Sequence, residues 1–218
     1  MAEPQDSCIG WWKLEDRLAE IGTDAIEHGT STWNPCKFGN GYYGNNLSNY
    51  LSIASGNGIG LTQGIIEFWF KPNYASTLFV HAGIMGDASS TYDLTFYTHN
   101  GKHTFWRGGK YVHIAGTWNT GDVMHYMGVW DSSAGFDGAK TLALYIDGVE
   151  IGSNTGALTI PSADTLNIGK IATYNKTANA VVDNLKIYNN ATVYLDVIAN
   201  KDTEGWGSTT NFSQAIII

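Results

Sequence analysis

The stretch LALYIDGVEIGS (residues 142–153) carries the clearest structural pattern in this chain. Its apolar residues alternate with a period of two, which indicates a β-strand with one buried face. Asp147-Gly148 then interrupts the alternation, and both residues suit the positive φ angles of a two-residue hairpin turn. Val149 starts the return strand. The stretch therefore predicts a β-hairpin, and it contains no pattern typical of a catalytic site.

The same alternation and turn chemistry recur along the rest of the chain. The segment GIIEFWFKP (residues 64–72) alternates well, and Asn100-Gly101 predicts a second hairpin turn. Residues 14–25 contain helix formers, but Gly22 limits them to at most a brief helix in a loop. We therefore expect an all-β fold, a single antiparallel sandwich of two sheets. The predicted strands cover residues 8–14, 38–43, 50–54, 65–71, 78–85, 92–98, 103–107, 111–118, 124–130, 141–146, 149–152, 166–169 and 181–188.

The composition supports one β domain and argues against two classes of partner, nucleic acids and anionic membranes. The chain has 218 residues, of which 43% are hydrophobic, 13% aromatic and only 15% charged. The net charge of −8 argues against nucleic acids and anionic membranes, because both are bound through Lys and Arg. No apolar run approaches the roughly 20 residues that a membrane helix needs. The charge is compatible with neutral glycans, calcium or a protein partner.

The two ends of the chain differ from the rest. Residues 1–7 are polar and acidic and do not resemble a secretory signal, so the chain either acts where it is made or has lost a signal. We expect one domain over residues 1–199 and a tail over residues 200–218. The tail ends in three isoleucines, and an exposed β-branched end tends to associate. We expect it to dock on its own sheet or on a partner subunit, in a homo-oligomer or larger assembly.

Six segments in a fixed order resemble a known family. They are GWWKLED (10–16), KFGNGYYGNNLSNYLSIAS (37–55), GIIEFWFKP (64–72), GDVMHYMGVWD (121–131), LALYIDGVEIGS with LNIGK (142–153 and 166–170) and VVDNLKIYN (181–189). From about Cys8 to Asn190 the chain resembles a laminin-G-like domain of the concanavalin A-like lectin/glucanase superfamily. The resemblance implies a jelly-roll sandwich.

The function that this resemblance implies is broad, because fold alone does not determine function. Members bind glycans, proteins or calcium, and others are structural parts of surfaces and virus particles. We expect a non-catalytic binding or structural module at an extracellular or virion surface. A stand-alone secreted lectin-like domain is the alternative. A glycoside hydrolase is the third class.

The carboxylates do not support a glycosidase. Retaining glycosidases need two carboxyl groups about 5–5.5 Å apart, which one strand supplies from residues on the same face. The chain contains no Glu-x-Asp, and Glu67 and Glu150 each stand alone in a predicted strand. We therefore expect no enzymatic activity.

Exposed aromatic rings are the main candidates for glycan binding. Trp106 and Arg107 end a predicted strand and precede a glycine pair, so we expect them near a loop, and Tyr174 is also expected in or near a loop. We predict these three residues as ligand-binding. The alternative is that each aromatic ring packs in the core of the sandwich.

Acidic residues near the two terminal strands predict a calcium site. Glu15 and Asp16 end the first predicted strand, and Asp183 lies on the last. Terminal strands of jelly rolls commonly pair, which would bring these oxygen ligands together. The alternative is that Asp183 caps a neighbouring turn and Glu15 is solvated.

The two cysteines, Cys8 and Cys36, each lie beside an aromatic-rich predicted strand. A disulfide between neighbouring strands and two buried free thiols are both open.

Overall fold

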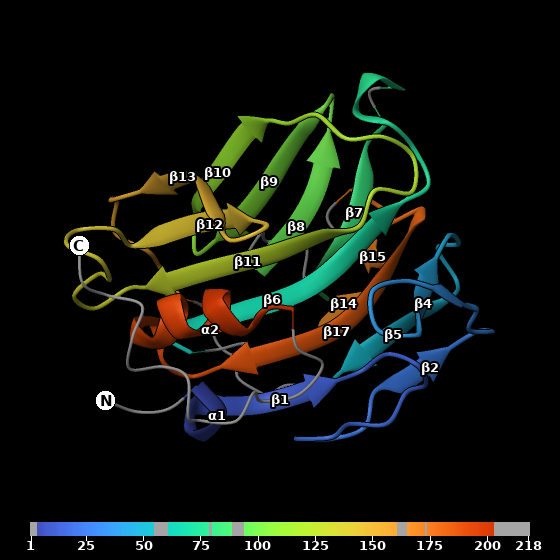
Figure 1. Cartoon of the computed structure of the whole chain (residues 1–218), viewed down its shortest axis with the longest axis horizontal. Coiled ribbons are helices and arrows are strands. Elements are labelled where there is room, and N and C mark those ends of the chain that lie inside the picture. Colours follow the sequence, from blue (N-terminus) through green and yellow to red (C-terminus); the bar gives the residue numbers. More distant parts are fainter. Residues whose placement is uncertain are drawn as a thin grey trace.

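Two antiparallel β-sheets pack face to face in a computed structural model that describes residues 4–54, 61–78, 80–88, 94–160, 165–172 and 174–202 (Figure 1). This confirms the predicted jelly-roll sandwich. Over the described ranges, the first sheet has eight strands, and β1 pairs with β17 beside the main path. Its strands, in spatial order, are β13 (Val149–Asn154), β12 (Leu142–Ile146), β11 (Met124–Asp131), β6 (Gln63–Pro72), β17 (Ala180–Tyr188), β4 (Asn40–Gly44) and β3 (Trp33–Pro35), with β1 (Cys8–Trp12).

The second sheet has seven strands in the same described ranges. Its strands, in spatial order, are β10 (Lys110–Ala115), β9 (Lys102–Arg107), β8 (Leu94–His99), β7 (Ala82–Asp87), β14 (Leu166–Ile168), β5 (Tyr50–Ile53) and β2 (Ile26–His28). A small hairpin joins β15 (Lys170–Ile171) to β16 (Lys176–Thr177). The helical segments are α1 (Pro4–Ser7), η1 (Ser76–Leu78), η2 (Ala191–Val193) and α2 (Tyr194–Asn200).

Both predicted hairpin turns are confirmed. Asp147 and Gly148 have φ angles of 52° and 83° between β12 and β13, and Asn100 and Gly101 have φ angles of 53° and 70° between β8 and β9. These positive angles suit a tight turn whose twist matches the strands on either side. Asp147 Oδ1 also accepts a hydrogen bond of 2.8 Å from the backbone N–H of His125, which ties the turn to β11.

Aromatic side chains fill the space between the two sheets. The Phe96 and Phe105 rings of the second sheet stack with their centroids 4.4 Å apart, and Phe68 of the first sheet meets Phe96 edge-on at 5.1 Å. Gly128 of β11 lies opposite this pair. A Cβ atom at Gly128 would lie 2.6 Å from Phe96 and 2.7 Å from Phe105, so this residue leaves room for the rings.

Part of the outer face of the first sheet is also buried, which corrects the prediction for residues 142–146. Their alternation predicts one exposed face, but Ala143 and Tyr145 are buried as fully as their neighbours. A second apolar cluster covers them. It combines Met127 of β11 with Val193 and Val197, because η2 and α2 lie across this face (Figure 1).

The ends of the chain are described only in part. β1 pairs with β17, as expected for the terminal strands. α2 ends at Asn200, and Asp202 accepts a hydrogen bond of 2.9 Å from the ammonium group of Lys37. The tail segment 203–218, on which the predicted docking depends, lies outside the described residues.

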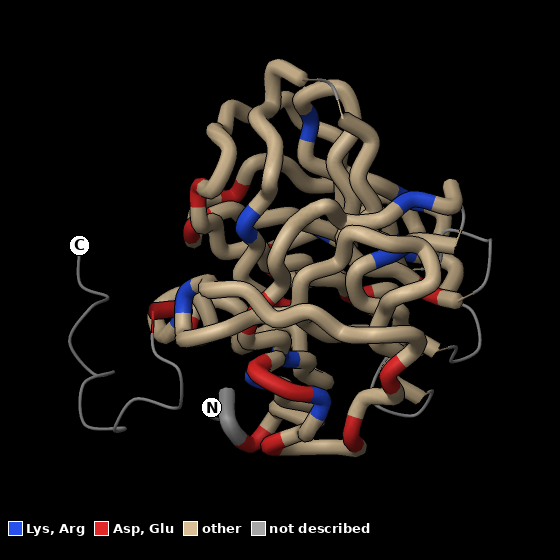
Figure 2. Tube along the Cα trace, turned by 90° about the vertical axis from the view of Figure 1, so that its right-hand side faces the viewer, with Lys and Arg blue, Asp and Glu red and all other residues tan. Residues whose placement is uncertain are grey.

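The charge distribution agrees with the composition. Lys and Arg positions are scattered singly along the described chain and form no continuous basic stripe (Figure 2). Within the described ranges, no helix is long and apolar enough to cross a membrane.

We predict that Gly128→Ala destabilises the fold by about 1–3 kcal/mol, because the added methyl group overpacks the contact between the sheets. The matched control is Gly156→Ala, where the new Cβ would meet the flexible end of Lys110 at 2.8 Å. Thermal and urea unfolding of both variants measure the effect. Equal stability of the two variants would contradict the role assigned to Gly128.

Candidate functional site

Three consecutive strands of the second sheet present one outer face. Tight turns connect β8 to β9 and β9 to β10, and the second turn uses Gly108 and Gly109 with φ angles of 54° and 80°. The strand register brings outward-pointing residues side by side in rows. The rows are Thr95–Trp106–Tyr111, Tyr97–Thr104–His113 and His99–Lys102–Ala115.

Aromatic rings dominate this face. Trp106 and Tyr111 stack with centroids 4.7 Å apart and an interplanar angle of 20°, and the ring of His113 meets Tyr111 edge-on at 6.5 Å. With Tyr97 and His99 these residues line a pocket of about 260 Å³. We call these five residues the aromatic patch. Tyr111 is 50% exposed, so its ring is available to a ligand.

Tyr174 borders the aromatic patch. It lies between β15 and β16, and its ring centroid is 4.4 Å from that of His81 and 5.7 Å from that of Tyr97. Burial lowers the pKa of His81 to about 4, with His99 adding to the effect, so His81 is neutral at physiological pH. His81 Nε2 is buried and has no hydrogen-bond partner among the described residues.

The structure brings together two of the three predicted ligand residues. Trp106 and Tyr174 lie on the same outer face, and Tyr97 lies between them, lining the pocket with Trp106 and contacting Tyr174. Arg107 was predicted wrongly. It is the last residue of β9, faces the interior and is fully buried, with its guanidinium 4.8 Å from the ring centroid of Trp130.

The reason for the error is the alternation of the strand. Neighbouring residues of a strand point to opposite faces, so Trp106 and Arg107 cannot share a surface while both are in β9. Both residues were expected near a loop because a glycine pair follows them, although the predicted strand 103–107 already included both. It also missed Tyr97, Tyr111 and His113. Counting back and forward from the Asn100-Gly101 turn would have paired Tyr97 with Thr104 and placed it on the face of Trp106.

A second pocket lies at the other end of the same face. It has a volume of about 370 Å³ and is lined mainly by β2, β5 and β14. His28 and Tyr50 stack there at 4.1 Å, and the Lys170 ammonium lies 3.5 Å from the Tyr50 ring centroid. The β15–β16 hairpin separates the two pockets. It sits directly on β7, where a Cβ at Gly83 would lie 2.4 Å from Ile171.

The predicted calcium residues lie at the β1–β17 end of the first sheet. Asp183 is fully buried and accepts a hydrogen bond of 2.9 Å from the Phe38 N–H, so it caps the neighbouring turn. Glu15 is exposed beside Gly39, close enough to act electrostatically on Asp183. Asp16 is exposed and accepts a hydrogen bond from the Leu18 N–H.

The carboxyl group of Asp183 is incompletely satisfied. Burial, with a smaller contribution from the charge of Glu15, raises the pKa of Asp183 to about 6. Backbone hydrogen bonds from Phe38 and Lys37 lower the pKa but do not outweigh these effects. Its Oδ1 atom has no hydrogen-bond partner among the described residues. No group of three or more His, Cys, Asp or Glu side chains in the described ranges is arranged to hold a metal ion.

Both cysteines are free thiols. Burial raises the pKa of Cys8 and of Cys36 to about 12, so neither forms a reactive thiolate at physiological pH. Of the two open alternatives, the structure has free thiols rather than a disulfide.

A family model described as the concanavalin A-like lectin/glucanases superfamily, of the laminin G type, matches residues 44–196. The matched range includes all three strands that carry the aromatic patch. No curated protein matches the chain in sequence.

Solved structures share the fold at low sequence identity. Domain 4 of an extracellular arabinanase from Geobacillus stearothermophilus, in complex with arabinotriose, is 16% identical with a TM-score of 0.66, and the match covers 88% of this chain and 97% of that one. The receptor-binding domain of a botulinum neurotoxin C/D mosaic is 14% identical with a TM-score of 0.70, over 89% of this chain and 51% of that one.

A structure of botulinum neurotoxin type C, whose cell entry depends on two ganglioside molecules, is likewise 14% identical with a TM-score of 0.70. The match covers 93% of this chain and 52% of that one, so this chain spans about half of each toxin domain. These likenesses show the fold. The chain belongs to the concanavalin A-like lectin/glucanase superfamily.

Proposed function

We propose that this chain is a non-catalytic carbohydrate-binding module whose ligand lies across the outer face of the second sheet. The observation that carries this proposal is the aromatic patch on β8, β9 and β10. Sugar rings present flat apolar C–H surfaces, and aromatic ring faces with negative quadrupoles suit them. The pocket is smaller than the roughly 300–1,000 Å³ of enclosing ligand sites, which suits a chain bound along a surface.

Polar groups at the aromatic patch suit sugar hydroxyls. Burial lowers the pKa of His113, with the charge of Lys102 adding to the effect, and its ring nitrogen Nδ1 lies 2.7 Å from Thr104 Oγ1. A neutral imidazole offers one donor and one acceptor nitrogen. The outward rows of β8, β9 and β10 contain no Asp or Glu.

The relatives support the ligand class and the location. One similar domain was solved with arabinotriose, and the cell entry of one similar toxin depends on interaction with two ganglioside molecules. The arabinanase is extracellular. We therefore place this module outside the cell or on a surface, bound to glycans there. A role in a larger assembly such as a virus particle depends on the tail, which lies outside the described residues.

The absence of catalysis is part of the proposal. Hydrolysis requires two cooperating carboxyl groups within reach of the substrate. Glu67 is only 4% exposed and lies on the first sheet, away from the aromatic patch. Its carboxylate is already engaged by His125 at 2.7 Å.

We also propose that calcium binds at the Asp183 corner. The supporting observation is the buried Asp183 oxygen that lacks a partner in the described structure, with the Glu15 carboxylate nearby. Calcium takes six to eight oxygen ligands, so these two carboxylates would supply only part of its shell. Asp16 is already used as a turn acceptor.

The aromatic patch predicts selective loss of binding. Trp106→Ala and Tyr111→Ala should each weaken glycan binding about tenfold or more, because large aromatic side chains dominate binding energy. A glycan array that includes arabino-oligosaccharides identifies the ligand, and calorimetry measures the affinity. Leu195→Ala, which removes a 53% exposed residue of α2, is the control. Unchanged affinity in both aromatic variants would contradict the proposed face.

The module should release no reducing sugar from β-glucan or arabinan. A reducing-end assay at high protein concentration measures this, with Glu67→Gln as the comparison. Hydrolysis by the wild type that disappears in Glu67→Gln would show that the chain is an enzyme.

Asp183→Asn should stabilise the protein in EDTA at pH 8 but hardly at pH 4. The pKa of Asp183 is about 6 in the folded protein and 3.8 for the ordinary group. Ionisation of Asp183 therefore destabilises the folded state as the pH rises from about 4 to 6. The cost is about 3 kcal/mol at most. Calcium should raise the melting temperature of the wild type and not that of the variant. A calcium-independent wild type would remove the calcium proposal.

A further inference from the structure

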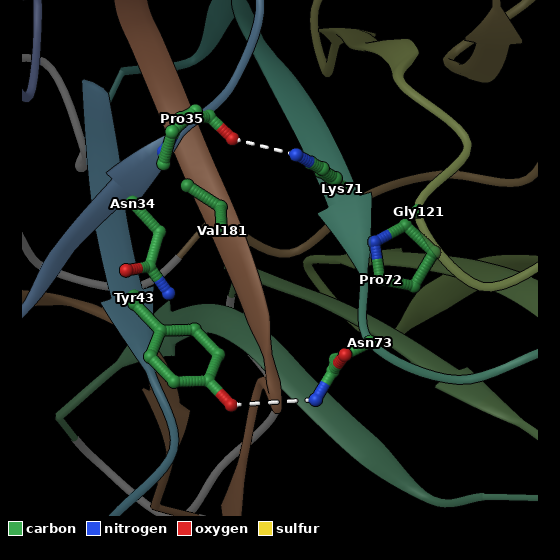
Figure 3. Close-up of a pocket in the computed structure, with 8 residues that line it drawn as sticks. All are labelled: Asn34, Pro35, Tyr43, Lys71, Pro72, Asn73, Gly121 and Val181. Carbon is green, nitrogen blue, oxygen red and sulfur yellow. Dashed lines mark hydrogen bonds between the residues drawn. The ribbon is translucent and has the colours of Figure 1, made fainter.

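A pocket of about 260 Å³ lies on the outer face of the first sheet (Figure 3). The helix α2 lies over another part of this sheet (Figure 1). The register explains the floor and walls of the pocket. Val181 of β17 pairs with Tyr43 of β4 on one side and with Lys71 of β6 on the other, so the three side chains share one face. Two strand spacings, roughly 9–10 Å, separate the backbones of Tyr43 and Lys71.

The two walls of the pocket differ in chemistry. Asn34, Pro35 and Tyr43 lie on one side, and Lys71, Pro72 and Asn73 lie on the other (Figure 3). The walls thus offer one aromatic ring, two proline rings, two carboxamides and one ammonium group. None of the described residues that line the pocket is an Asp or Glu.

Lys71 supplies the positive charge of this pocket. Its ammonium group donates a hydrogen bond of 2.8 Å to the Pro35 carbonyl. No ion pair with a carboxylate forms at Lys71 in the described structure, so its charge is not neutralised there. An ammonium group has three donors, so Lys71 retains two for a ligand.

The other polar groups of the pocket are also weakly engaged. The Tyr43 hydroxyl accepts a hydrogen bond from Asn73 Nδ2 and donates one to Asn179 Oδ1, both at 3.5 Å, the long limit for such bonds. The Asn34 carboxamide makes no side-chain hydrogen bond to any described residue. The Tyr43 hydroxyl and the Asn34 carboxamide can therefore form hydrogen bonds to a ligand without breaking strong hydrogen bonds within the protein.

We infer that this pocket is a second binding site, for a sugar unit that carries a carboxylate. The Tyr43 ring and the proline rings offer apolar surface to the sugar ring, and Asn34 and Asn73 offer donors and acceptors to hydroxyls. The Lys71 ammonium pairs with the carboxylate, a hydrogen bond strengthened by charge on both partners. The site is separate from the aromatic patch, because it lies on the other sheet and faces the opposite side of the sandwich.

The test uses a pair of probes that differ mainly in the carboxylate. Methyl β-D-glucuronide and methyl β-D-glucoside are titrated against the whole chain by NMR, with the methyl glycoside of N-acetylneuraminic acid as a second acidic probe. At least one acidic probe should bind at least tenfold more tightly than the glucoside. Lys71→Met should abolish that difference, and Lys110→Met, on the second sheet, should preserve it.

Three more variants locate the site. Tyr43→Ala should weaken binding of the acidic probe at least fivefold. Lys71→Arg, which keeps the charge, should retain that binding. Trp106→Ala should leave the acidic probe unaffected, which separates this site from the proposed glycan-binding face. Melting temperatures show that each variant is folded.

Three results would overturn the inference. They are failure of both acidic probes to bind, an affinity unaltered by Lys71→Met, and competition by acetate as strong as that of the acidic sugar. The last result would mean that the sugar ring contributes nothing. None of these results depends on whether the aromatic patch binds a glycan.

Discussion

Glu67 joins the three central strands of the first sheet through one buried carboxylate. It accepts hydrogen bonds from His125 of β11 and Tyr188 of β17, and the Lys186 ammonium lies 3.7 Å away. Burial favours the neutral acid, but the bond from His125, the charge of Lys186 and the bond from Tyr188 outweigh it and hold the pKa of Glu67 below its usual value. An ionised group in this position is tolerated only with these partners, since breaking a buried pair costs roughly 3–5 kcal/mol. The register of β6, β11 and β17 is thus tied to polar contacts as well as to apolar packing.

The elements that cover this network also leave other parts of the two sheets open. η2 and α2 cover the outer face of the first sheet beside Glu67, where Met127, Val193 and Val197 pack together. Glu67 is only 4% exposed, and its carboxylate contacts His125, Tyr188 and Lys186 of the same sheet. Among the described residues, pockets lie on the outer face of the second sheet, which carries the aromatic patch, and on the uncovered part of the first sheet near β3 and β4, which carries the Lys71 pocket.

Local sequence signals predicted the strands and turns well because these depend on neighbouring residues. Asp147-Gly148 and Asn100-Gly101 turn where their φ preferences indicate. The short strands β2, β3, β15 and β16 were missed, because two or three residues carry no periodic signal. The alternation in β12 showed which residues share a face but not what covers each face. The covering helix, α2, comes from a segment some 50 residues later whose sequence shows no clear hydrophobic period. The partners of Glu67 were equally hidden, because they come from β11 and β17.

The candidate site was predictable to the extent that it follows from register. Trp106 and Tyr174 were predicted from their residue types, and the structure places both on one face. The prediction that Arg107 binds a ligand was wrong because Trp106, its neighbour in the strand, faces outward and Arg107 therefore faces the interior. The Lys71 pocket depends on β17 lying between β4 and β6, a pairing of segments more than 100 residues apart that no local pattern reveals. Because the two proposed sites face opposite directions, a ligand of a few sugar units cannot reach both. Combined binding would strengthen attachment only where a long glycan passes around the sandwich or where glycans are displayed on two surfaces.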